Sequence, residues 1–238
     1  MRIIAFLTLL WSLSFAAPAS GQQHTKRAYT KELPLIYEDA WDLWPYVFND
    51  EDGNPSGYNV DLLKMIFEEL NIPFEIHLKP TSKALEDLRN GKSDLMLGMV
   101  ANFHDAYTLY YGKNVIQLFT HSVAHPKDAS QRVHQVEDLA SQEVIVHDGS
   151  FSHHLMIDHG WGDNAIAHGD MDNAIQLVSS NGTGQVLWNT MSLKWLIHKY
   201  HANNLTLSPV DMPSGDYRFM SNDKHLLELL LADRKSVV

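Results

Sequence analysis

The sequence contains no cysteine among its 238 residues, so neither a disulfide nor a lipid attached to cysteine can stabilise or anchor it. Basic residues are also scarce, because 18 lysines and arginines face 29 acidic residues and leave a net charge of -11. Nucleic acid and anionic membrane surfaces are therefore poor partners. Beyond the N-terminus no apolar run approaches the length of a membrane span. The chain is long enough to bury a hydrophobic core of its own.

The N-terminus has the pattern of a secretory signal peptide. Arg2 precedes an apolar run from Ile3 to Phe15, and small residues follow it. We expect residues 1–21 to be removed, which predicts a periplasmic protein with no membrane insertion after cleavage. A retained transmembrane anchor is the alternative, and the shortness of the run disfavours it, since a bilayer span needs about 20 apolar residues.

After this leader, short apolar runs alternate with amphipathic helical segments as far as the C-terminus. Such alternation is typical of an α/β protein with largely parallel sheets. The spacing of Val60, Leu63 and Phe67 predicts a helix with one apolar face. The predicted strands are Leu33–Tyr37, Ile72–Leu78, Asp94–Gly98, Asn114–Ala124, Glu143–His147, Ala165–His168, Gln185–Trp188, Leu205–Val210 and Tyr217–Met220. The predicted helices are Tyr58–Leu70, Ser82–Arg89, Val136–Ala140, Ser150–His159, Met171–Ser180, Met191–Tyr200 and Lys224–Leu231.

This order of elements predicts two α/β lobes joined by crossing strands. Lobe 1 would comprise residues 30–117 and 207–238, and lobe 2 residues 118–206. The C-terminal ends of the strands in both lobes would face the space between them, where open α/β sheets bind ligands. We therefore expect the ligand cleft between the lobes.

Several stretches carry a resemblance to a known family. GYNVDLLKMIFEEL (Gly57–Leu70) resembles the signature helix of the family 3 extracellular solute-binding proteins, and it follows an aromatic-proline-aromatic loop, Trp44–Tyr46. ALEDLRNGKSDLMLGM (Ala84–Met99) and VEDLASQEVIVHDGS (Val136–Ser150) are similar to the later helix-turn-strand of that family and to the opening of its second lobe. The resemblance implies a type II periplasmic binding protein fold that closes on a small-molecule solute. Its partner would be an ABC-type membrane permease, or a transmembrane signalling protein such as a receptor kinase of which this chain is the sensor domain.

The same resemblance draws attention to two changed residues. Family members that bind amino acids use an arginine for the ligand's α-carboxylate, and Asp105 stands at about that position. The aspartate that accepts from the ligand's α-ammonium aligns with Asn189. An aspartate repels a carboxylate, and an asparagine supplies no counter-charge. We therefore expect a ligand other than an ordinary zwitterionic amino acid.

The remaining candidate residues are mostly aromatic or neutral, which suits a neutral, cationic or aromatic solute. Each has a structural alternative: Trp44 and Tyr46 as core residues of lobe 1, and Ser150 and Asn189 as helix caps. The predicted ligand-binding residues are Trp44, Tyr46, Met99, Asn102, Asp105, Ser150, Trp188 and Asn189.

The histidines do not form a metal motif. His147, His153, His154, His159 and His168 crowd one segment, but their spacing does not bring imidazoles to one helix face. We interpret them as surface or pH-responsive residues and predict neither a metal nor a cofactor.

An enzyme on the same fold is the alternative function. Glu38, His104 and Asp105 could support acid-base chemistry in a dehydratase-like protein or in one fused to a peptidoglycan-cleaving domain. No nucleophile triad or phosphate-binding loop supports this, so we predict no catalytic residues.

Overall fold

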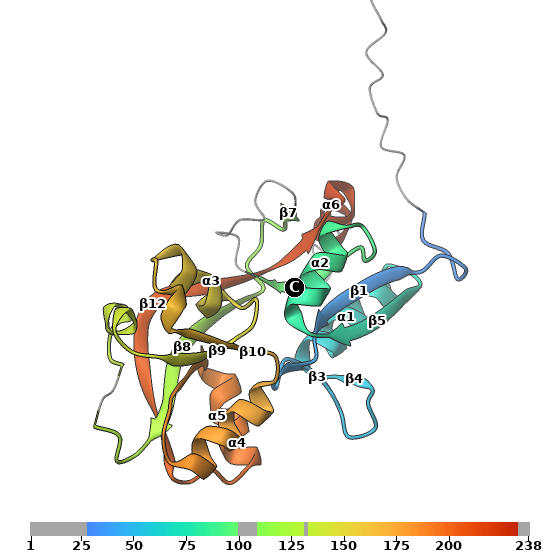
Figure 1. Ribbon diagram of the computed structural model, residues 1–238. Helices are drawn as coiled ribbons and strands as arrows, with labels where there is room; N and C mark the ends of the chain where they lie inside the picture. The colour runs from blue at the N-terminus through green and yellow to red at the C-terminus, as the bar shows by residue number, and fades with distance from the viewer. Residues whose placement is uncertain (1–27, 100–108, 131–132, 233–238) are drawn as a thin grey trace, which may run out of the picture.

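The structure is a computed structural model, and it describes residues 28–99, 109–130 and 133–232. Two α/β lobes lie side by side, and the long strand β12 (Leu205–Ser221), which pairs with β8 (Gln117–Pro126), runs from one to the other (Figure 1). No helix in the described ranges is long and apolar enough to cross a membrane.

The first lobe is built on the parallel pair β1 (Leu35–Ala40) and β5 (Phe74–Lys79). Tyr37 also bridges to Leu95, just before β6 (Met96–Met99), and β7 (Tyr110–Tyr111) pairs with β12. The helices are α1 (Tyr58–Glu69), α2 (Thr81–Arg89) and α6 (Lys224–Ala232). The apolar face predicted for α1 is confirmed, because Val60, Leu63 and Phe67 are fully buried.

The segment between β1 and α1, for which the sequence predicts no strand, forms a small antiparallel sheet. Its strands are β2 (Asp42–Leu43), β3 (Val47–Asn49) and β4 (Pro55–Ser56). Strands of two or three residues are too short to show an alternating pattern, so the sequence does not reveal them. Gly57 then opens α1 at a φ of 110°, where a Cβ atom would lie 2.6 Å from the carbonyl oxygen of Tyr46. Only glycine fits this position.

The second lobe is a mixed sheet in the order β10 (Ala165–His168), β9 (Val144–His147), β11 (Val186–Asn189), β8 and β12. Its helices are α3 (Phe151–Asp158), α4 (Met171–Asn181) and α5 (Thr190–Lys199). The predicted helix Val136–Ala140 is a 3-10 helix, and Gly162–Asn164 forms another.

The crossing strands β8 and β12 connect the lobes. β12 pairs with β8 from Leu205 to Val210, shifts register, and resumes the pairing from Gly215 to Tyr217. Its last residues pair with β6 and β7 of the first lobe. The two strands predicted as Leu205–Val210 and Tyr217–Met220 are therefore parts of one long strand. The predicted boundary at residue 117 falls in β8, and the one at residue 206 falls in β12. The division into lobes at these residues stays a prediction.

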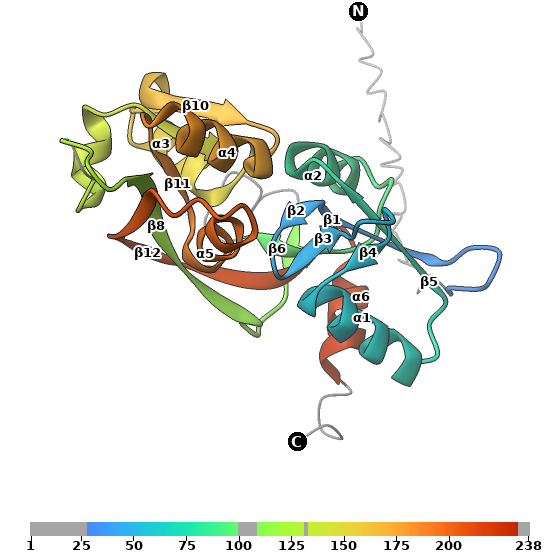
Figure 2. The same ribbon diagram turned by 90° about the horizontal axis from the view of Figure 1, so that it is seen from below.

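The lobes are packed against each other. One hydrophobic cluster contains Leu43 and Val47 from the first lobe together with Met171 and Leu193 from the second. In the view of Figure 2, β12 passes from one lobe to the other. The structure therefore shows a closed arrangement.

Candidate functional site

A small cavity lies between the lobes. Its volume is about 40 Å³, room for about three water molecules at 10–15 Å³ each. The first lobe supplies Asp39, Ala40, Leu43, Thr81, Met96 and Gly98, and the crossing strands supply Phe119, His121 and Tyr217. The second lobe supplies His147, Ser150, Phe151, Ser152, Trp188 and Asn189. A larger solute needs the lobes to move apart before it can occupy this site.

Among the described lining residues, Asp39 is the one with a carboxylate. It lies at the end of β1 and is only 1% exposed. Alternation along the strand places Tyr37 on the same face, and the Tyr37 hydroxyl donates a hydrogen bond to Asp39 Oδ2. The Ala40 N–H donates to Oδ1 at 2.7 Å. Burial nevertheless raises the pKa of Asp39 from 3.8 to about 7, which shows that these two donors do not offset the loss of water.

No lysine or arginine is among the described residues that line the cavity with Asp39. The adjacent segment 100–108, whose structure is not described, contains neither lysine nor arginine. The walls near Asp39 include the partly buried aromatic side chain of Tyr217. Loss of water around its hydroxyl, followed by the charge of Asp39, raises the pKa of Tyr217 well above 10.0. A buried carboxylate with aromatic neighbours is an environment that favours a bound cation.

A second carboxylate, Asp42, connects the two lobes. Its Oδ1 lies 3.2 Å from His147 Nε2, at an angle that does not meet hydrogen-bond geometry. Its Oδ2 accepts from the backbone N–H of Met171 at 3.2 Å, at the first residue of α4. His147 Nδ1 lies 3.5 Å from the Thr81 hydroxyl. His147 thus bridges β2 and α2 of the first lobe from the end of β9.

Trp44 makes the reciprocal contact to α4. Its indole N–H donates to Asp172 Oδ2 at 2.9 Å. Lys199 Nζ lies 2.6 Å from the other oxygen of Asp172 and 4.0 Å from the centre of the Trp44 ring. Asp42 of the first lobe therefore accepts a hydrogen bond from the N-terminus of α4. Trp44 of the first lobe donates one to Asp172 in the same turn of α4.

Comparison with known proteins assigns this two-lobed arrangement to a family. A model described as bacterial extracellular solute-binding proteins, family 3, matches residues 40–196. The chain belongs to this family. Across the described residues its fold is the predicted type II periplasmic binding protein fold, with the site between two lobes.

The proteins similar to this family 3 protein include binding proteins and a sensor domain. Amino-acid-binding protein AabA of Dichelobacter nodosus is 28% identical over 116 residues, 46% of this chain and 43% of AabA, so the match spans less than half of that relative. A histidine kinase sensor domain with similarity to periplasmic binding proteins superposes with a TM-score of 0.76 at 22% identity, covering 85% of this chain and 91% of the other. Arginine-bound ArgBP from T. maritima gives 0.74 at 20% identity, covering 86% and 96%. At these identities the two structures show the shared fold.

The predicted ligand-binding residues are divided between the cavity and its surroundings. Ser150, Trp188 and Asn189 line the cavity. Ser150 also caps α3, accepting from the His153 N–H at 3.3 Å. Asn189 caps α5, accepting from the N–H groups of Met191 and Ser192 at 2.9 and 3.0 Å. Ser150 and Asn189 therefore act as helix caps and also line the cavity.

The other predicted residues lie outside the cavity or outside the described residues. Tyr46 packs in the core against Phe119 with ring centres 4.8 Å apart, and Trp44 joins the lobes as described above. Met99 ends β6, but its side chain is outside the described part of the chain, so its role stays a prediction. Asn102 and Asp105 fall within residues 100–108, outside the described residues, so their role stays a prediction.

Sequence reasoning missed Asp39, His121 and His147. His147 was interpreted as a surface or pH-responsive histidine, and the surface alternative is wrong for it, because it is 3% exposed and lines the cavity. The usable signal was the alternation in LIYEDA, which places Tyr37 and Asp39 on one face and Glu38 on the other. No cluster of three or more potential metal ligands occurs within the described ranges.

Proposed function

We propose that this chain is the ligand-binding domain of a periplasmic receptor that closes on a small cationic solute and transmits closure to a membrane partner. The carrying observation is Asp39, a buried carboxylate in the interlobe cavity, whose described lining contains two histidines but no lysine or arginine. A cationic amine or guanidinium group would supply the missing counter-charge and lower the pKa of Asp39.

The relatives support a binding function of this class. AabA is named an amino-acid-binding protein, and the ArgBP structure contains arginine, whose side chain is a cation. The partner would be a permease or, as in the similar histidine kinase sensor domain, a transmembrane signalling protein. The predicted signal peptide, which agrees with a periplasmic location, lies outside the described residues.

The solute we propose lacks an α-carboxylate. No lysine or arginine from the described residues lines the cavity, and residues 100–108 offer none, so a carboxylate would meet Asp39 without a paired cation. The N-terminus of α3 at Ser150 is the one feature of the described lining that favours an anion. Agmatine and arginine make a sharp comparison, because they share the guanidinium and differ by the carboxylate.

The enzyme alternative gains no support from the structure. Glu38, one of the proposed acid-base residues, points away from the cavity, and its Oε1 lies 2.5 Å from Lys79 Nζ. The matched family is described as solute-binding proteins, and AabA is named an amino-acid-binding protein. We therefore propose binding without turnover.

A thermal-shift screen tests this function. We expect agmatine and related amines to raise the melting temperature of the wild type, arginine to do so less, and neutral glutamine least, because a ligand stabilises the folded state by RT ln(1 + [L]/Kd). Mass spectrometry of each solute after incubation should find no product. Equal stabilisation by arginine and agmatine would refute the absence of a carboxylate anchor, and stabilisation by glutamine alone would refute the cationic class.

A further inference from the structure

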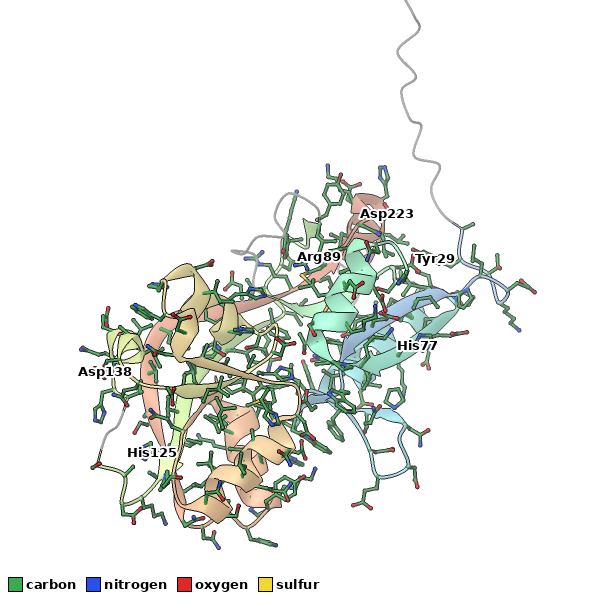
Figure 3. All side chains as sticks on the ribbon, viewed as in Figure 1. Tyr29, His77, Arg89, His125, Asp138 and Asp223 are labelled. Carbon is green, nitrogen blue, oxygen red and sulfur yellow. The ribbon has the colours of Figure 1, made fainter. Side chains whose placement is uncertain are left out.

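The crossing strand β8 contains two buried histidines, four residues apart, that differ in their hydrogen bonds. His125, labelled in Figure 3, is fully satisfied: Nδ1 lies 2.7 Å from the carbonyl oxygen of Pro126 and Nε2 lies 2.8 Å from the Ser208 hydroxyl. His121 is 7% exposed and lines the cavity, yet its buried Nδ1 has no hydrogen-bond partner among the described residues. Two hydrogen bonds therefore account for the burial of the His125 imidazole, whereas the buried Nδ1 of His121 has no such partner among the described residues.

The surroundings of His121 keep its imidazole neutral. Burial lowers its pKa from 6.5 to about 4, and its ring packs against Phe151 with centres 5.0 Å apart. A neutral imidazole has one donor nitrogen and one acceptor nitrogen. A buried polar group that finds no partner in the protein costs stability, so a position of this kind is retained most readily where a ligand supplies the partner.

We propose that His121 is a ligand-binding residue that accepts a hydrogen bond from an N–H or O–H group of the bound solute. This inference rests on the proposed function and narrows it. The solute would have a cationic group at Asp39 and a second hydrogen-bond donor at His121, as diamines and agmatine do. The two residues come from different strands, β1 and β8, and line the same cavity.

The position of His121 also places this contact where the lobes join. His121 pairs with Asn189 of β11 and with Val210 of β12, and the register of β12 against β8 shifts immediately after Val210. A solute held by His121 would therefore contact β8 next to the register shift between β8 and β12. Binding and the geometry of the strand crossing would be connected through one side chain.

The test is His121→Phe, which keeps an aromatic ring against Phe151 and removes both ring nitrogens. We expect the ligand-free variant to be at least as stable to urea as the wild type, because an unpartnered buried polar atom is removed. We expect its affinity for agmatine to fall about tenfold, in line with the loss of one buried hydrogen bond. His121→Asn, which returns an acceptor near the position of Nδ1, should recover part of that affinity.

The matched control is His125→Phe, which removes a histidine with two satisfied hydrogen bonds from the same strand. It should lower stability and leave agmatine affinity within about twofold. The inference is overturned if His121→Phe destabilises the ligand-free protein as His125→Phe does, or if it binds agmatine as tightly as the wild type. Failure of the wild type itself to bind any cationic solute would overturn the proposed function and this inference together.

Discussion

Replacing Asp39 with asparagine should make the protein more stable at neutral pH and abolish its binding of cations. Asparagine keeps both local hydrogen bonds, since its amide oxygen can accept from the Ala40 N–H and its amide nitrogen can donate to the Tyr37 hydroxyl. The substitution removes only the charge that burial disfavours. This gain in stability, combined with a loss of function, is expected of a buried group kept for a ligand.

The magnitude follows from the pKa of Asp39. Burial raises it from 3.8 to about 7, and each unit corresponds to about 1.4 kcal/mol. The folded protein holds this proton more tightly than the unfolded chain, so its free energy of unfolding decreases as pH rises from about 4 to 7. The total decrease from this group is up to about 4 kcal/mol, complete above pH 7 and absent below pH 4.

Urea denaturation followed by circular dichroism at pH 4.5, 6 and 8 measures this effect. The gain of Asp39→Asn over the wild type should be smallest at pH 4.5 and reach up to about 4 kcal/mol at pH 8. The exposed residue Asp128 provides the control, and Asp128→Asn should follow the wild type at every pH. A variant that is less stable than the wild type at pH 8, or a gain independent of pH, would refute the reasoning.

Two further predictions concern the closed arrangement. Gly149→Ala should lower stability by about 1–3 kcal/mol from its positive φ and also weaken agmatine binding, because the new Cβ would lie 3.3 Å from backbone atoms of Ser82 in the other lobe. Gly160→Ala, with a similar φ but nothing within 4 Å, is the control and should not weaken binding in calorimetry. Trp44→Phe removes a hydrogen bond to the charged Asp172 and should cost the closed state about 1.5–3 kcal/mol. Solution scattering should then measure a larger radius of gyration. An unchanged radius would show that the Trp44–Asp172 contact does not hold the lobes together.

Much of the fold was predictable because its helices and strands repeat regular patterns. The apolar spacing of α1 and the short apolar runs of β9 and β11 follow directly from burial on one face or on both. The small β2–β4 sheet was missed because its strands are too short for periodicity. The continuity of β12 through Asp211–Gly215 was missed because Pro213 and Gly215 are typical of turns.

The site was less predictable because it depends on which strand ends meet. Ser150 at a helix start, Trp188 at a strand end and Asn189, aligned by the family resemblance, do line the cavity, and their binding of a ligand stays a prediction. His121 and Asp39 point into the cavity only because β8 and β1 present particular faces to it, and a sequence does not show which face of a strand meets the other lobe. His147 differs from its neighbouring histidines only in lying at the end of a buried strand.

The most direct test of a cationic solute held by Asp39 is the number of protons released on binding. Isothermal titration of agmatine into the wild type at pH 7, in two buffers of different ionisation enthalpy, measures it. Because the free carboxyl titrates at a pKa of about 7 and the bound one should be ionised, about half a proton should be released per solute. Release near zero with tight binding, or identical binding by Asp39→Asn, would contradict the account.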